Sequence, residues 1–200
     1  MTLRRPSWVA WLLAVVLAGI LLGLALRAHS AGTAAGYDRA LFMPHGWPTV
    51  GESCRTVREL VLARDSVIPV DWDAKGCHVR RGWWRDAYDR AKITDPAALD
   101  IDHVVPLEWA WQHGADRWTP EQREAFATEY RFRWALRVTS RHWNRQKGSH
   151  GLEGWLPPGA GDEELCDYGL GWAGMLAWYG LEVPASTRTL LGTLLQRCGP

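Results

Sequence analysis

The stretch Ile101-Asp102-His103-Val104-Val105-Pro106-Leu107 places an acid and an imidazole side by side within a β-branched run. The run from Leu99 to Val105 predicts a strand. Pro106 ends that strand, because proline has no N–H to donate to a sheet. Two groups able to carry chemistry therefore stand at the end of a predicted strand.

A second stretch begins 42 residues after Asp102: Asn144-Arg145-Gln146-Lys147-Gly148. Residues 134–139 predict another short strand. Ser140 is a favourable N-cap and Gly148 a favourable C-terminal residue for a helix over 141–147. The middle of the chain thus reads as strand, insertion, strand and helix, with polar motifs at both ends.

These residue types predict phosphodiester chemistry. The oxygens of Asp102 and Asn144 are hard ligands that suit Mg²⁺ or Mn²⁺. A neutral His103 can take a proton from water near pH 7. A divalent ion with a neighbouring base is a combination that hydrolyses phosphate esters.

The two stretches together resemble the HNH (His-Me finger) endonucleases, in particular small exported bacterial HNH endonuclease-like proteins. Asp102 to Leu107 resembles the first motif, Asn144 to Gly148 the closing motif, and Trp155-Leu156-Pro157-Pro158 the segment that follows. The resemblance implies an α+β fold with a ββα-metal core. It also implies a metal-dependent endonuclease acting on DNA, or on RNA. Nothing in the sequence resembles a base-reading module such as a zinc finger, so little sequence preference is expected.

The resemblance implies roles for individual residues. Asp102 and Asn144 are expected to bind Mg²⁺ or Mn²⁺, and His103 is expected to act as the general base. The chain also departs from the family: Ala135 stands where members commonly have an asparagine that pins the loop between the strands, which puts the orientation of His103 in doubt. Moreover, adjacent strand residues point to opposite faces, so we expect the strand to end or bulge at Asp102.

Basic residues gather next to the second motif. Between Arg131 and Lys147 there is no acid, which predicts a phosphate-tracking strip beside the metal; a solvated surface is the alternative. The residues expected to contact nucleic acid are Arg137, Arg141, Arg145 and Lys147. Nothing in the sequence indicates a protein partner.

The first residues predict export. Arg4 and Arg5 precede an apolar run from Trp8 to Leu26, which as a helix is about 28 Å long, close to the thickness of a bilayer core. Residues 1–31 are therefore expected to be a signal anchor, or else a cleaved signal peptide; either places the remainder outside the cytoplasm, membrane-anchored or secreted. Residues 32–52 follow as a tether and lead-in, and 53–200 as the nuclease-like domain.

The full chain has 200 residues, a formal net charge of +1 and four cysteines. A composition of 47% hydrophobic and 22% charged residues excludes a disordered chain. We expect disulfides Cys54–Cys77 and Cys166–Cys198, because each pair closes a local loop within one half of the sequence; four free thiols are the alternative. Further helices are expected over 56–66, 106–113, from Thr119 onward, and over 171–179 and 186–197.

Two other functions fit the sequence. One is a different metal-dependent phosphoesterase built on the same residues. The other is a catalytically silent envelope module that binds nucleic acid or a protein, a reading that Ala135 supports.

Overall fold

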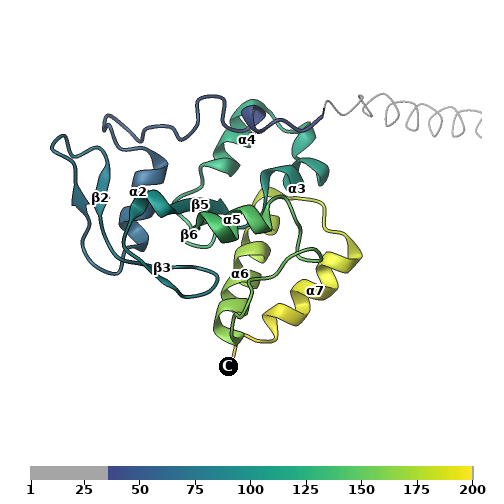
Figure 1. Cartoon of the computed structure of the whole chain (residues 1–200). Coiled ribbons are helices and arrows are strands. Elements are labelled where there is room, and N and C mark those ends of the chain that lie inside the picture. Colours follow the sequence, from purple (N-terminus) through teal and green to yellow (C-terminus); the bar gives the residue numbers. More distant parts are fainter. Residues whose placement is uncertain (1–35, 200) are drawn as a thin grey trace, which may run out of the picture. The chain divides into compact units, whose positions relative to one another are not determined.

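A computed structural model describes residues 36–199, and the elements from Tyr37 onward make up the unit described below (Figure 1). The predicted signal anchor over 1–31 lies outside the described residues. Among the described helices, none is long and apolar enough to cross a membrane. Within 37–52, assigned above to the tether and lead-in, Phe42 is fully buried in the core of this unit.

The central element is an antiparallel pair of strands, β5 (Leu99–His103) and β6 (Leu136–Ser140). Their register runs without interruption from Leu99 opposite Ser140 to His103 opposite Leu136. The insertion between the strands forms three helical segments: α3 (Leu107–Gln112), η3 (Ala115–Arg117) and α4 (Pro120–Ala127). The predicted order of strand, insertion, strand and helix is therefore confirmed.

Helix α5 (Arg141–Lys147) begins directly after β6 and packs on both strands (Figure 1). The Ser140 hydroxyl accepts a hydrogen bond from the Trp143 N–H and so caps the first turn. Gly148 ends the helix with a φ of 53°, a conformation that glycine adopts without a steric penalty. These caps fix the place of Asn144 and Lys147 over the strands.

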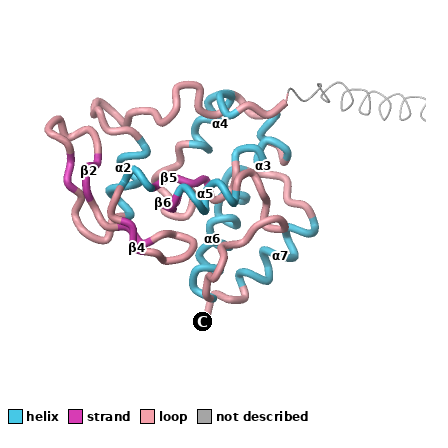
Figure 2. The backbone as a smooth tube through the Cα atoms, in the orientation of Figure 1, coloured by secondary structure: helices cyan, strands magenta, loops and turns pink. Residues whose placement is uncertain are grey.

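Helix α2 (Val57–Asp65) packs on the same pair of strands and closes a second small core. Thr56 caps it through a hydrogen bond from the Glu59 N–H. Two short hairpins follow, with the bounds β1 (Asp71–Trp72), β2 (Val79–Arg81), β3 (Trp84–Arg85) and β4 (Lys92–Ile93), and the 3-10 segments are η1 (Arg39–Leu41) and η2 (Pro96–Ala98). Figure 2 shows how much of this part of the unit is loop.

Two helices complete the unit, α6 (Asp162–Tyr179) and α7 (Ala185–Leu195), which pack against each other (Figure 1). Helix α6 begins nine residues before the predicted Gly171. Its first turn carries Asp162, Glu163 and Glu164, and acids there are stabilised by the helix dipole. Gly171 lies inside this helix, where the close packing leaves no room for a side chain: a Cβ there would lie 2.8 Å from the Trp134 carbonyl oxygen.

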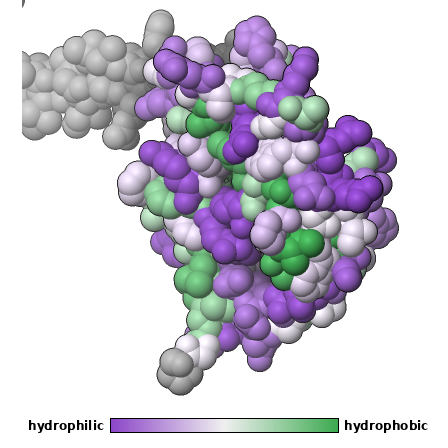
Figure 3. Space-filling model, turned by 90° about the vertical axis from the view of Figure 1, so that its left-hand side faces the viewer, coloured by the Kyte–Doolittle hydropathy of each residue, from purple (hydrophilic) through white to green (hydrophobic). Residues whose placement is uncertain are grey.

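Both predicted disulfides are present. Cys54–Cys77 and Cys166–Cys198 have Cα–Cα distances of 5.2 and 5.0 Å. The second bond ties the start of α6 to the residues after α7. On the face shown in Figure 3, hydrophilic residues surround separate small hydrophobic areas rather than one large patch.

Candidate active site

A cleft of about 340 Å³ opens where β5, α3 and α5 meet. Three of the sequence-predicted residues, Asp102, His103 and Asn144, line it together with Arg145. The structure adds Tyr37 and Arg39 from the N-terminal segment and Glu108 from α3. The two sequence motifs therefore meet at one cleft, as expected.

His103 is held on two sides. Its Nε2 lies 2.8 Å from the Ala127 carbonyl oxygen, and its ring stacks on Trp47 with centroids 5.5 Å apart. A carbonyl can only accept, so Nε2 carries the proton and Nδ1 keeps the lone pair. His103 therefore presents a defined tautomer.

The electrostatic surroundings keep this histidine neutral. Burial, followed by the positive charge of Arg39, lowers the pKa of His103 to about 3. The bond to Ala127 raises the pKa, and the charge of Lys147 lowers it further. At neutral pH the imidazole is thus uncharged, and its Nδ1 lone pair is unprotonated.

Asp102 faces away from His103, into a buried polar cluster. Its two carboxylate oxygens lie 3.0 and 2.9 Å from the Lys147 ammonium, and the Tyr88 hydroxyl donates to one of them. Lys147 also donates to the His103 carbonyl oxygen at 2.6 Å. Lys147 is fully buried and its ammonium pairs with Asp102, so this arrangement does not support its role as a phosphate contact, which stays a prediction.

Strand alternation explains this arrangement. Asp100 and Asp102 lie on the face of β5 that α5 covers, and Asn144 Nδ2 donates to Asp100 Oδ2 at 2.9 Å. Asp100 and Asp102, two residues apart on the strand, thus contact Asn144 and Lys147, which are three residues apart on the helix. The expected bulge at Asp102 is absent, because β5 continues through His103.

The family resemblance implies a divalent ion, and the residues present fit it only in part. Asn144 uses its Nδ2 on Asp100, which leaves its Oδ1 as a hard oxygen donor. Asp102 is 4% exposed and already paired with an ammonium. Among the described residues, no group of three or more His, Cys, Asp or Glu side chains could hold a metal. In this arrangement the Asp102 carboxylate is not available as a metal ligand.

The predicted basic strip divides into two parts. Its first members pair with acids: Arg131 lies 2.6 Å from Glu129, Arg133 lies 3.3 Å from Asp65, and Arg137 lies 3.9 Å from Asp167. Arg137 also lines a different cleft, on the side of Asp86 and Tyr168. The strip is therefore not continuous.

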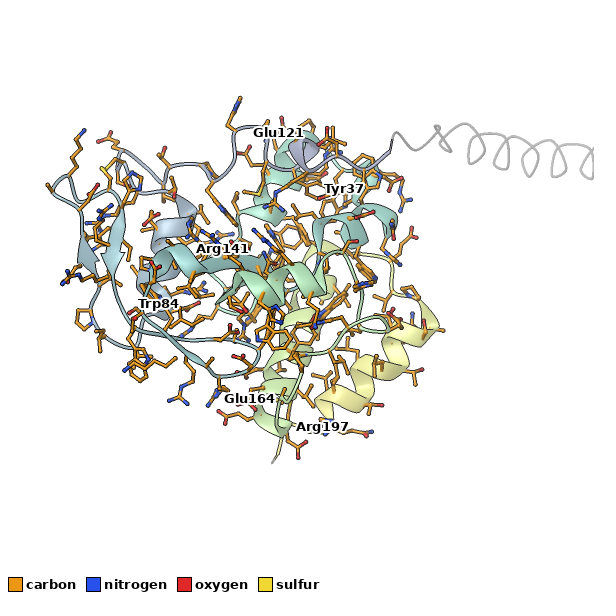
Figure 4. All side chains as sticks on the ribbon, in the orientation of Figure 1. Tyr37, Trp84, Glu121, Arg141, Glu164 and Arg197 are labelled. Atoms are coloured by element: carbon orange, nitrogen blue, oxygen red, sulfur yellow. A yellow bond between two sulfur atoms is a disulfide. The ribbon has the colours of Figure 1, made fainter. Side chains whose placement is uncertain are left out.

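Arg141 and Arg145 differ from these paired residues. Both are exposed on α5, and neither forms an ion pair with any acid in the described part of the chain. Figure 4 shows Arg141 at the start of α5. Of the four predicted nucleic-acid contacts, Arg141 and Arg145 are the two without an acid partner among the described residues; contact of all four with nucleic acid stays a prediction.

Ala135 does not leave His103 loose. Its side chain is 2% exposed and packs in the main core. Its carbonyl oxygen accepts the Val104 N–H at 3.1 Å. The Ala127 carbonyl and the Trp47 ring hold the imidazole instead.

Sequence reasoning missed Asp100, Tyr88, Trp47 and Arg39. The alternation of Asp100 with Asp102 could have revealed the first of these. The other three reach the site from loops and from the N-terminal segment, where no periodic pattern marks them.

Comparison with known proteins supports a nuclease-like domain. Residues 64–130 match the family model described as the C-terminal domain of GmrSD restriction endonucleases. This segment contains Asp102 and His103 but ends before Asn144.

A relative from Arthroderma benhamiae, described as an uncharacterized secreted protein, is 37% identical over 180 residues, covering 90% of this chain and 83% of the relative. No solved structure matches the chain significantly. The chain therefore belongs to one family with this secreted protein, and its residues 64–130 are similar to the C-terminal domain of GmrSD restriction endonucleases.

Proposed function

We propose that the chain is an endonuclease that hydrolyses phosphodiester bonds in nucleic acid, with DNA favoured over RNA and with little sequence preference. The observation that carries the proposal is His103: a buried, neutral imidazole of fixed tautomer that lines a cleft together with Arg145. Base-reading elements are not part of this cleft, which supports recognition of the backbone.

His103 acts as the general base. Its Nδ1 takes a proton from a water molecule while the water oxygen attacks phosphorus. The bond to the leaving sugar oxygen breaks, and that oxygen takes a proton from solvent. The cationic Arg145 holds the negatively charged phosphate in the cleft.

Dependence on Mg²⁺ or Mn²⁺ is a separate part of the proposal. A divalent ion would neutralise phosphate charge in the cleft. Asn144 would hold it through Oδ1, and Asp102 only after giving up its contact with Lys147. A test of metal binding therefore decides whether Asp102 and Asn144 are ligands, and it does not bear on the role of His103.

We further propose that the protein acts outside the cytoplasm. The relative from Arthroderma benhamiae is described as secreted, and two disulfides suit an oxidising compartment. Whether residues 1–31 act as an anchor or as a cleaved peptide stays a prediction. An uncleaved anchor would give a membrane-bound protein, and a cleaved peptide would give a secreted one.

A second candidate is the catalytically silent module. The observation that favours it is the Asp102–Lys147 pair, which ties up the one acidic ligand assigned to the metal. Incubation with supercoiled plasmid in Mg²⁺, in Mn²⁺ and in excess chelator separates the two candidates. Nicking that requires a divalent ion supports the endonuclease; binding of plasmid without nicking in any of these conditions supports the silent module.

A further inference from the structure

A second cleft lies beside the first and shares a wall with it. Arg39 and Asn144 line both clefts, so the two are contiguous. The second cleft is also lined by Trp47, Arg58, Asp100 and Arg141. It reaches from the N-terminal segment across the start of β5 to α5.

This second cleft is rich in uncompensated positive charge. It holds three guanidinium groups and one carboxylate, Asp100, which already accepts a hydrogen bond from Asn144. Within the described residues, Arg39, Arg58 and Arg141 form no ion pair with an acid. Elsewhere on the unit, arginines such as Arg64, Arg131 and Arg133 are paired.

Arg58 is also held in place. Its Nη2 donates to the carbonyl oxygens of Pro96 and Leu99, at 3.1 Å each. Carbonyl partners leave the guanidinium charge uncompensated, and a guanidinium has five donors, so others remain. Arg39 makes only a weak contact with the Met43 sulfur, at 3.6 Å. Backbone hydrogen bonds therefore hold Arg58 in place, whereas Arg39 and Arg141 are less constrained.

We propose that Arg39, Arg58 and Arg141 form a second phosphate subsite, which binds a backbone phosphate next to the one held in the cleft of His103. The inference rests on the proposed function, because it assumes that the first cleft holds the scissile phosphate. Guanidinium groups match phosphate oxygens in pairs. A strand with repeated phosphates can fill both clefts at once, whereas a single inorganic phosphate can fill only one.

The subsite can be tested by binding without cleavage. Fluorescence anisotropy of a labelled oligonucleotide in excess chelator compares the parent with the double variant Arg39→Gln/Arg141→Gln. The matched control is Arg131→Gln/Arg133→Gln, which removes the same charge from arginines that already have acid partners. Arg58 is left unchanged because it also braces the backbone before β5.

The expected result is a loss of affinity of tenfold or more in the Arg39/Arg141 variant, with the control within about twofold of the parent. The salt dependence should also flatten by roughly one to two contacts, since each phosphate contact contributes about 0.7–0.9 to the logarithmic slope. In a second arm, inorganic phosphate at matched ionic strength should displace the parent's oligonucleotide only weakly, as expected if the strand is held at two phosphates.

Equal losses in the two double variants, or no loss in either, would overturn the subsite. Displacement by inorganic phosphate as effective as that by unlabelled oligonucleotide would overturn it as well. These results are distinct from a failure of the proposed function. If the parent never nicks plasmid, but only the Arg39→Gln/Arg141→Gln variant loses affinity for the oligonucleotide, the subsite is supported and the nuclease activity is contradicted.

Discussion

The Lys147 ammonium lies within 3.0 Å of both carboxylate oxygens of Asp102, although neither side chain is more than 5% exposed. The pair joins α5 to β5 directly beneath the candidate active site. Burial opposes the charged form and lowers the pKa of Lys147, while the charge of Asp102 raises it. The two charges therefore depend on each other.

Removing one member of this pair should be costly. Lys147→Met leaves the Asp102 carboxylate buried without its cation, which typically costs about 3–5 kcal/mol of unfolding free energy. The double variant Lys147→Met/Asp102→Leu should recover most of that loss, because it leaves no charge unpaired. Urea denaturation followed by tryptophan fluorescence measures all three proteins. A single variant as stable as the parent would show that the pair is not formed.

Metal binding should depend on the same pair. If Asp102 is a latent ligand, Mn²⁺ should raise the melting temperature of Lys147→Met more than that of the parent, because the ion can replace the lost ammonium. Asn144→Ala in the same background should reduce this stabilisation. Thermal denaturation with and without Mn²⁺ gives the answer, and equal shifts in the parent and Lys147→Met would remove Asp102 from the ligand set.

Stability should fall in acid in part because of His103. The pKa of this residue is about 3 in the folded protein and near its ordinary value of 6.5 in the unfolded chain. Between these values the unfolded state binds the extra proton, so the contribution is complete above about pH 6.5 and is lost as the pH falls toward 3. His103→Gln should flatten this part of the profile, measured by urea unfolding at several pH values. His142→Gln, which removes an exposed imidazole on α5, is the control, and equal profiles for the two variants would contradict the account.

Both disulfides should be formed in the purified protein. Thiol labelling of the purified, unreduced protein should find no free cysteine. Cys166→Ser/Cys198→Ser should lower the unfolding free energy by about 3 kcal/mol, as expected for a closed loop of this size. Reactive thiols in the parent would contradict both the pairing and the export that it supports.

Local sequence rules predicted the elements around the site well. Thr56, Thr119 and Ser140 each cap the helix that their residue type predicts. The strand ending near Pro106 and the helix ending at Gly148 follow from the chemistry of proline and glycine. Such features depend on neighbours within one turn or one strand, so a single sequence carries them.

The polar contacts inside the site could not be predicted in the same way. Lys147 is predicted to contact phosphate, but it is buried, because the Asp102 carboxylate and the His103 carbonyl oxygen, from a distant part of the chain, accept its hydrogen bonds. Trp47 and Arg39 come from a segment that looked like a tether. Their roles depend on tertiary packing, which neither spacing nor composition reveals.

The most direct test of the central claim is nicking of supercoiled plasmid by the parent and by His103→Ala, at equal protein concentration and under the divalent-ion conditions that give the parent its highest rate. Arg133→Gln serves as a control outside the cleft. The account predicts that His103→Ala binds plasmid like the parent but nicks it about 10²–10⁴-fold more slowly, the usual contribution of a general base. A His103→Ala variant that nicks at the parent's rate would contradict it.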